Sequence, residues 1–177
     1  WSSDVCSSDL IKPACAASVS KLVSVLGTEA TVQREYTRAL IRDFGEGCAV
    51  TLVGAPRLPE LAEASLKGEA VSDDDIAREV APCFVEAEGR RTDTVVLACT
   101  HYPLLLERLI QLAPWPVSFI DPAPAIARRV AELLGPHRPT EPSAAMLMFS
   151  SGRAPSPALA AALQGFGLVS HAAQLTA

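Results

Sequence analysis

The sequence predicts an α/β fold, a parallel sheet flanked by helices, and three features of the chain support this. Apolar runs rich in β-branched residues alternate with stretches of helical periodicity, which is the order expected of a parallel sheet covered on both faces. The apolar runs end in turns of small, hydroxyl-bearing or proline residues, and such turns meet at the carboxyl edge of a sheet. Apolar residues make up 49% of the 177 residues, so the chain can bury a core.

The individual strands and helices follow from periodicity and from the residues that punctuate it. Strands are expected at 21–26, 49–54, 94–98, 117–120 and 146–149. Helices are expected at 29–44, 57–67, from 72 towards 88, 104–110, 125–134 and 155–164. Gly45 ends the first helix, Pro82 kinks or breaks the third, and Asp121 caps the fifth.

Composition excludes several classes of partner. The net charge of −5, with no basic run, argues against a nucleic-acid partner. No apolar run is long enough to span a bilayer, so no membrane partner is expected. The five cysteines lack the spacing of a disulfide framework or a metal site, which indicates a reducing compartment and a cytoplasmic protein.

The stretch 94–103 places three reactive or polar side chains on a turn between a strand and a helix. Cys99, Thr100 and His101 follow the buried strand and precede Pro103, which is tolerated in the first turn of a helix. Unpaired backbone N–H groups there favour an anion, either a substrate carboxylate or the Cys99 thiolate. Most cysteines are small buried hydrophobes, and most threonines before a helix are caps. Spacing alone therefore gives a candidate thiol at a candidate ligand site.

The octapeptide Leu97-Ala98-Cys99-Thr100-His101-Tyr102-Pro103-Leu104 resembles the second active-site motif of the glutamate racemases in the Asp/Glu racemase superfamily. In that motif Gly or Ala precedes Cys-Thr-His-Tyr/Phe-Pro. The resemblance extends from about Ile11 to Gly167 in the order of the family. The further matching segments are 11–14, 26–32 followed by Tyr36, 58–63 and 149–152.

The resemblance implies a cofactor-independent enzyme that interconverts L-glutamate and D-glutamate by proton transfer between two thiol bases and Cα. Such an enzyme supplies D-glutamate for peptidoglycan and so serves cell wall biogenesis and cell shape. The resemblance makes Cys99 one of the two bases and His101 the residue that orients or stabilises its thiolate. It implies that Thr100, with nearby backbone N–H groups, holds the substrate carboxylate, and that His101, Thr28 and Thr31 contact the substrate.

A glutamate on the expected helix 57–67 also has two interpretations. Glu60 and Glu63 lie three residues apart on one side of the helix, and on spacing alone they form a solvated face. Aligned through Leu58 and Leu61, the family pattern places its own catalytic glutamate on Glu63. The resemblance therefore implies a catalytic role for Glu63.

The chain divides into three parts. Residues 1–10, in which Ser-Ser-Asp occurs twice, resemble a translated sequencing adapter, with a genuine polar tail as the alternative. Residues 11–140 are expected to form the second racemase domain, which carries the Cys-Thr-His motif. After a proline-rich linker at 135–142, residues 141–177 are expected to be a strand and helix that belong to a truncated first domain.

The other catalytic face is missing from this sequence. In the family, a Cys-Asn-Thr motif in the first domain carries the second base, and neither Cys15-Ala16-Ala17 nor Cys48-Ala49-Val50 matches it. We therefore expect this chain to be inactive alone. Cys15, Cys48 and Cys83 are interpreted as structural, because no His or acid stands at a useful spacing from them.

No cofactor or metal is expected, and glutamate is the expected small-molecule partner. The sequence has no lysine context for pyridoxal phosphate and no glycine fingerprint for a nucleotide. His137 and His171 are isolated, which gives no metal ligand set. A homodimer is one option for the intact protein.

Three other functions are kept as alternatives. The first is an aspartate or hydantoin racemase of the same superfamily. The second is a Cys-dependent acyl-transfer enzyme with a Cys–His pair, although His101 is so close to Cys99 in sequence that its ring is not expected to reach the sulfur productively. The third is a binding domain without catalysis, in which replacing Cys99 would leave function intact.

Overall fold

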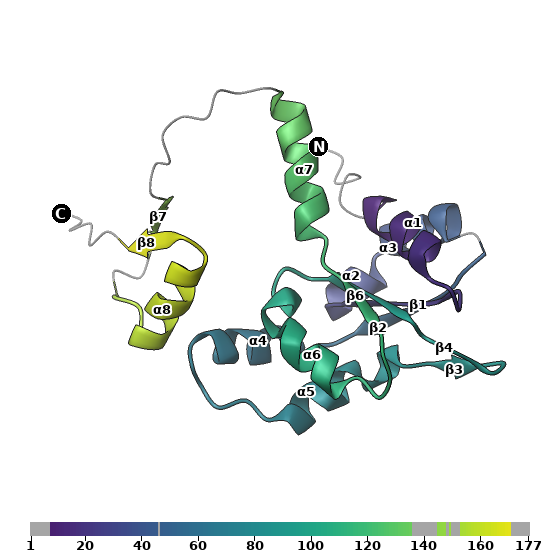
Figure 1. The fold of residues 1–177 in the computed structure, drawn as a ribbon, viewed down its shortest axis with the longest axis horizontal. Coiled ribbons are helices and arrows are strands. Elements are labelled where there is room, and N and C mark those ends of the chain that lie inside the picture. Colours follow the sequence, from purple (N-terminus) through teal and green to yellow (C-terminus); the bar gives the residue numbers. More distant parts are fainter. Residues whose placement is uncertain (1–7, 46, 136–144, 148, 150–152, 171–177) are drawn as a thin grey trace.

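The computed structural model describes residues 8–45, 47–135, 145–147, 149 and 153–170. At its centre is a parallel four-stranded sheet in the order β2-β1-β5-β6 (Figure 1). These strands are β1 (Leu22–Gly27), β2 (Ala49–Gly54), β5 (Thr94–Ala98) and β6 (Ser118–Ile120). The predicted α/β fold with a parallel sheet is confirmed.

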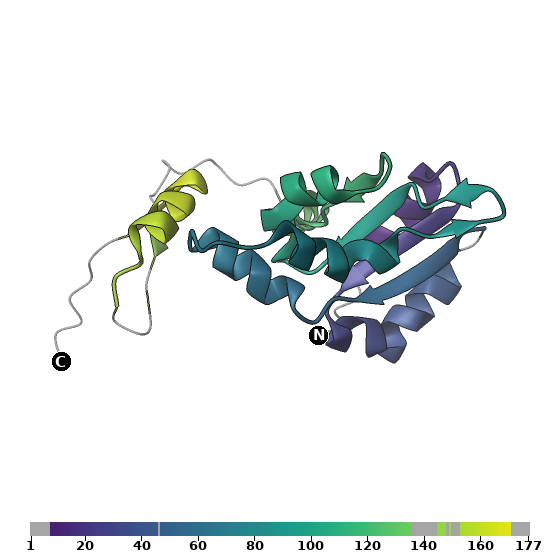
Figure 2. The ribbon, with the colours of Figure 1, turned by 90° about the horizontal axis from the view of Figure 1, so that it is seen from below.

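Helices cover both faces of the sheet, because both faces of its central strands are apolar. Alternate residues of a strand point to opposite faces. One face packs against α1 (Ser8–Ala17) and α3 (Glu35–Phe44), and the other packs against α4 (Leu58–Leu66), α5 (Asp73–Val80) and α6 (Leu106–Leu112) (Figure 2). The strand residues in the first core are Val23, Val25 and Val96, and those in the second are Leu26, Val53, Val95 and Leu97.

The register of the sheet brings three turns to one edge. Gly27, the last residue of β1, pairs with Gly54 of β2 and with Ala98 of β5. The turns that follow these three strands therefore leave the sheet side by side at its carboxyl edge. This edge is where open α/β sheets bind ligands.

Two predicted helices are wrong in their extent. The helix expected at 29–44 is broken into α2 (Glu29–Gln33) and α3, because Arg34 between them is extended, with φ −66° and ψ 130°. The Thr37 hydroxyl donates to the Thr31 carbonyl at 2.7 Å and so satisfies a group that the break leaves free.

The helix expected to run from Ser72 towards Glu88 ends at Val80. The 3-10 helix η2 (Ala81–Cys83) follows it, since Pro82 lacks the N–H that would continue the α-helix. A hairpin of β3 (Glu86–Ala87) and β4 (Arg90–Arg91) comes next, and its turn residues Glu88 and Gly89 have φ of 52° and 73°. Positive φ at both positions is typical of a two-residue type I′ hairpin turn.

The remaining elements follow the prediction with small shifts. After β5 come the 3-10 helix η3 (Tyr102–Leu105) and α6, and α7 (Ala123–Leu134) begins where the Asp121 carboxylate accepts from the Ala123 N–H at 2.9 Å. In the part of the chain that the structure describes, no helix is both long and apolar enough to cross a bilayer.

The C-terminal elements form a separate pair of strands with a helix. β7 (Ala145–Leu147) pairs in parallel with β8 (Leu168–Ser170), and α8 (Pro157–Gly165) connects them. β8 was not predicted. Of the expected linker at 135–142, only Gly135 is described, and α1 includes residues 8–10 of the segment interpreted as a tail.

A carboxylate before β5 holds the loop between α1 and β1. One oxygen of Asp93 accepts from the hydroxyls of Ser18 at 2.6 Å and Thr94 at 3.0 Å, and the other accepts from the backbone N–H of Val19 and Ser20 at 2.8 and 2.7 Å. Burial opposes ionisation of Asp93, but these four hydrogen bonds outweigh it and lower its pKa.

We expect Asp93→Asn to lower the free energy of unfolding by about 1–3 kcal/mol at neutral pH, because the donors lose a charged acceptor. Since the pKa of Asp93 is lower in the folded state, its stabilisation is full above the unfolded pKa and is lost as the pH falls through the folded pKa. Urea denaturation should therefore show the difference between the two proteins shrinking towards about pH 3. Asp43→Asn on the exposed side of α3 is the matched control, with an expected change within about 0.5 kcal/mol. A difference that did not vary with pH would contradict this assignment.

Candidate active site

The turn after β5 carries the candidate thiol. Cys99 and Thr100 form the turn, and His101 precedes η3, which has Pro103 in its first turn as predicted. The Cys99 carbonyl accepts from the Tyr102 N–H at 3.2 Å, and the His101 carbonyl accepts from the Leu104 N–H at 3.1 Å. These two bonds fix the backbone on which the functional side chains stand.

Tyr102 anchors this turn to the neighbouring part of the edge. Its side chain is fully buried, and its hydroxyl donates to the carbonyl of Ala55, just after β2, at 3.2 Å. Burial raises the pKa of Tyr102, with a further contribution from the nearby Cys99, so the hydroxyl keeps its proton for this bond. The turn is thereby held against the start of α4.

Four side chains form a continuous chain of polar contacts from this turn to α4. Cys99 Sγ lies 3.7 Å from His101 Nδ1. His101 Nε2 lies 3.4 Å from one carboxylate oxygen of Glu63, and Lys67 Nζ lies 3.0 Å from the other. The structure thus brings the predicted residues Cys99, His101 and Glu63 together. The expectation that the His101 ring would not reach the sulfur is wrong, since the turn folds the ring back onto the thiol.

The charges and hydrogen bonds of these four side chains favour an ionised Glu63. The hydrogen bond and the positive charge of Lys67 are the main causes that lower the pKa of Glu63, and His101 adds a smaller contribution. The Cys99 side chain is half-buried and packs against the second core, whereas the side chains of His101, Glu63 and Lys67 are between 38% and 50% exposed. One side of the Cys99 thiol therefore packs against the core, and the other side is accessible to solvent.

The two threonines at the end of β1 are engaged with each other. The hydroxyls of Thr28 and Thr31 lie 2.9 Å apart, and Thr28 also accepts from the Thr31 N–H at 3.2 Å as the N-cap of α2. Among the described residues, no hydrogen bond joins them to Cys99, although they share its edge of the sheet. Thr100 is exposed in the turn, and the Tyr36 side chain lies outside the described residues, as do His137 and His171.

Sequence reasoning missed Lys67 and the anchoring role of Tyr102. Lys67 follows Glu63 by four residues, a spacing that places the two on one side of a helix, so a signal was present. The hydrogen bond from Tyr102 to Ala55 joins residues that are 47 apart in the sequence, so no local sequence pattern predicts it. Glu60 is exposed on α4, as its interpretation as a solvated residue requires.

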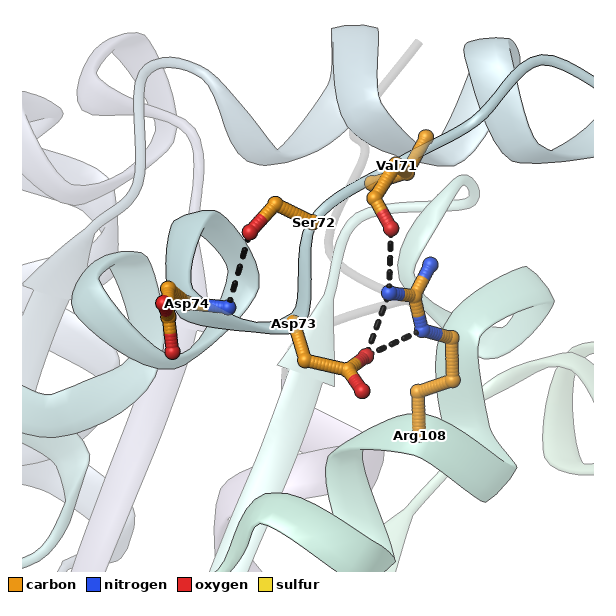
Figure 3. Close-up of polar contacts among 5 residues, drawn as sticks. All are labelled: Val71, Ser72, Asp73, Asp74 and Arg108. Atoms are coloured by element: carbon orange, nitrogen blue, oxygen red, sulfur yellow. Dashed lines mark hydrogen bonds and ion pairs between the residues drawn. The ribbon is translucent and has the colours of Figure 1, made fainter.

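A second polar cluster fixes the helix that follows the turn (Figure 3). Arg108 of α6 donates from Nε to the Asp73 carboxylate at 2.8 Å and from a terminal nitrogen to the Val71 carbonyl at 2.7 Å. Ser72, which lies between Val71 and Asp73 in the sequence, caps α5 by accepting a hydrogen bond from the Asp74 N–H at 3.2 Å. α6 is thereby tied to the start of α5 on the same face of the sheet.

The sequence model of the Asp/Glu/hydantoin racemase family matches residues 11–130. The chain is 51% identical over 160 residues to a glutamate racemase of Sinorhizobium medicae, covering 89% of this chain and 59% of that protein. It is 50% identical over 161 residues to a glutamate racemase of Brucella canis, covering 89% of this chain and 58% of that protein. The chain thus spans about three fifths of the length of these relatives.

Solved structures of glutamate racemases also resemble this fold. Escherichia coli glutamate racemase, in complex with L-glutamate and the activator UDP-MurNAc-Ala, aligns with a TM-score of 0.74 and 38% identity, over 90% of this chain and 60% of that chain. The RacE1 isoform of glutamate racemase from Bacillus anthracis aligns with a TM-score of 0.62 and 23% identity, over 73% of this chain and 47% of that chain, and supports the fold alone. Because the family match covers more than half of the sequence, this chain belongs to the Asp/Glu/hydantoin racemase family.

Proposed function

We propose that this chain supplies one of the two catalytic thiols of a cofactor-independent glutamate racemase, which interconverts L-glutamate and D-glutamate at Cα. The observation that carries the proposal is the contact chain in which Cys99 Sγ lies 3.7 Å from His101 Nδ1 and His101 lies 3.4 Å from Glu63. Two relatives about 50% identical to the chain are named glutamate racemase, which favours glutamate as the substrate.

The proposed chemistry needs a base on each face of Cα. The Cys99 thiolate takes the Cα proton, which leaves a carbanion and a thiol, and a second base on the opposite face returns a proton. His101 orients the sulfur and stabilises its anionic form. Glu63, held ionised by Lys67, fixes the orientation of the imidazole in turn. His101 and Glu63 thus act through the sulfur.

The substrate carboxylate is assigned to the open side of the turn. Thr100 is exposed there, next to Cys99, and offers a hydroxyl to an anion. Thr28 follows the adjacent strand β1 and Thr31 lies in α2, and either hydroxyl can turn from its partner towards a ligand. These three residues are proposed to bind the substrate.

A single thiol performs half of this reaction. No Cys-Asn-Thr sequence occurs in the 177 residues, so we propose that this chain alone does not racemise glutamate. Together with the missing base it would supply D-glutamate for peptidoglycan in the cytoplasm, with a homodimer as one option for its assembly.

A Cys-dependent acyl transfer is the second candidate, and one observation favours it. A thiol, an imidazole and a carboxylate in sequence of contact are also the parts of a nucleophile activated by a base. The two candidates differ in product, since acyl transfer leaves an acyl group on Cys99 and racemisation leaves the sulfur unmodified.

The test joins residues 11–177 to the part of the Sinorhizobium medicae relative that this chain does not span. We expect the joined protein to interconvert L- and D-glutamate, followed by circular dichroism, and Cys99→Ser to slow it by about 10²–10⁴-fold, because a serine hydroxyl is a far weaker acid than a thiol. Cys48→Ser, under reducing conditions, is the matched control and should keep full activity. The 177-residue chain by itself should show none.

Three results of this test would count against the proposal. Full activity in Cys99→Ser would remove Cys99 from the mechanism. Turnover of L-aspartate or a 5-substituted hydantoin in place of glutamate would assign the protein to another substrate of the same family. An acyl adduct on Cys99, found by mass spectrometry, would favour acyl transfer.

The role of Lys67 gives a prediction that needs no turnover. In Lys67→Met we expect the pKa of Glu63 to rise towards its ordinary value, because the main cause that lowers it is gone. A carboxyl NMR titration measures this pKa. As the pH is lowered, any activity that needs ionised Glu63 should begin to fall at a higher pH in Lys67→Met than in the unsubstituted protein. Lys12→Met on α1 is the control and should leave the titration of Glu63 unchanged. An unchanged pKa of Glu63 in Lys67→Met would contradict the contact chain.

A further inference from the structure

Two cysteines from distant parts of the sequence meet at the amino edge of the sheet, opposite the edge that carries Cys99. Cys15 lies in the last turn of α1, and Cys48 directly precedes β2. The Cys48 thiol donates to the Cys15 carbonyl with the sulfur 3.6 Å from the oxygen, across 33 residues of sequence. Sequence spacing gave no sign of this pair, and each cysteine was interpreted separately as structural.

The two thiols share one buried environment. Burial is the main cause that raises the pKa of Cys15 to about 12, and a side-chain hydrogen bond with Cys48 adds to it, while Lys21 opposes it. Both cysteines are unbonded thiols packed in the first core, beside Val23 and Val25. Two thiols on segments that lie this close together can reach the separation that a disulfide needs when their side chains rotate.

The two thiols differ in access. Cys15 is only 6% exposed, whereas Cys48 is partly exposed. An oxidant from solution therefore reaches Cys48 first, and Cys15 is positioned behind it as the resolving thiol. The Lys21 ammonium donates to the Cys15 carbonyl at 2.8 Å and so places a positive charge beside the pair.

We propose that Cys15 and Cys48 form a reversible disulfide with each other, and that the oxidant is a small disulfide such as oxidised glutathione. The Cys48 thiolate attacks one sulfur of oxidised glutathione, which breaks its S–S bond and releases one glutathione thiolate. Cys15 gives up its proton to solvent, attacks the Cys48 sulfur of the mixed disulfide and releases the second glutathione. The two cysteines lose two electrons and two protons, and oxidised glutathione takes them up.

The bond would tie α1 to the beginning of β2. It would close a loop that contains β1, α2 and α3, and a closed loop reduces the freedom of the unfolded chain. The oxidised protein should therefore have a higher Tm than the reduced one. Cys99 takes no part, so this inference does not depend on the proposed function.

The test uses the whole chain with Cys6→Ser, so that each informative tryptic peptide holds one cysteine. Trypsin leaves the Lys12–Pro13 bond intact and yields peptides 1–21 and 43–57, which contain Cys15 and Cys48. After treatment with oxidised glutathione, mass spectrometry without reduction should show these peptides linked, with both thiol hydrogens lost. Dithiothreitol should separate them, and the Tm should rise on oxidation and fall again on reduction.

Two variants in the same background are the controls. Cys15→Ala and Cys48→Ser should show no rise in Tm on oxidation, and circular dichroism of the reduced proteins checks that they fold. Cys99→Ser should still form the link. A glutathione adduct on Cys48 without the link to Cys15, or a link from Cys48 to the peptide 92–108 that contains Cys99, would overturn the proposal.

Discussion

The buried tyrosine after the Cys-Thr-His turn is the constraint on which the candidate site depends. Its hydroxyl bonds the Ala55 carbonyl, so the turn after β5 is held against the connection between β2 and α4. This places the ring of His101 where it contacts both Cys99 and the Glu63 carboxylate. A turn without this anchor would leave the thiol with a histidine but no fixed acid. Burying a phenol without its hydrogen bond costs about 1–3 kcal/mol, so the bond also keeps the core intact.

The core strands of the fold are predictable because their burial on both faces leaves unbroken apolar runs. The helix boundaries are less so, since they depend on single residues that adopt a local conformation. Arg34 is extended and divides a helix whose apolar pattern is continuous, and no residue near it signals a break. Pro82 signals a break, and the structure has the helix end there, but the Glu88–Gly89 hairpin turn that follows was not predicted.

The candidate site was predictable in part. Cys99 and His101 lie on one turn, so a local pattern locates them, and the resemblance to a family adds Glu63 from another helix. Contacts between distant segments leave no local trace, which is why the Tyr102 anchor and the meeting of Cys15 with Cys48 appear only in three dimensions. The parallel strands place Cys99 at the carboxyl edge of the sheet and the pair Cys15 and Cys48 at the opposite, amino edge.

The central claim is that the Cys99 thiol exchanges the Cα proton of glutamate for a proton from solvent. The most direct measurement is NMR of L-glutamate incubated in D₂O with residues 11–177 joined to the part of the Sinorhizobium medicae relative that this chain does not span. If the claim is right, the D-glutamate that forms carries deuterium at Cα, and Cys99→Ser forms it about 10²–10⁴-fold more slowly. D-Glutamate that retained the original Cα hydrogen, or labelling at an unchanged rate in Cys99→Ser, would contradict it.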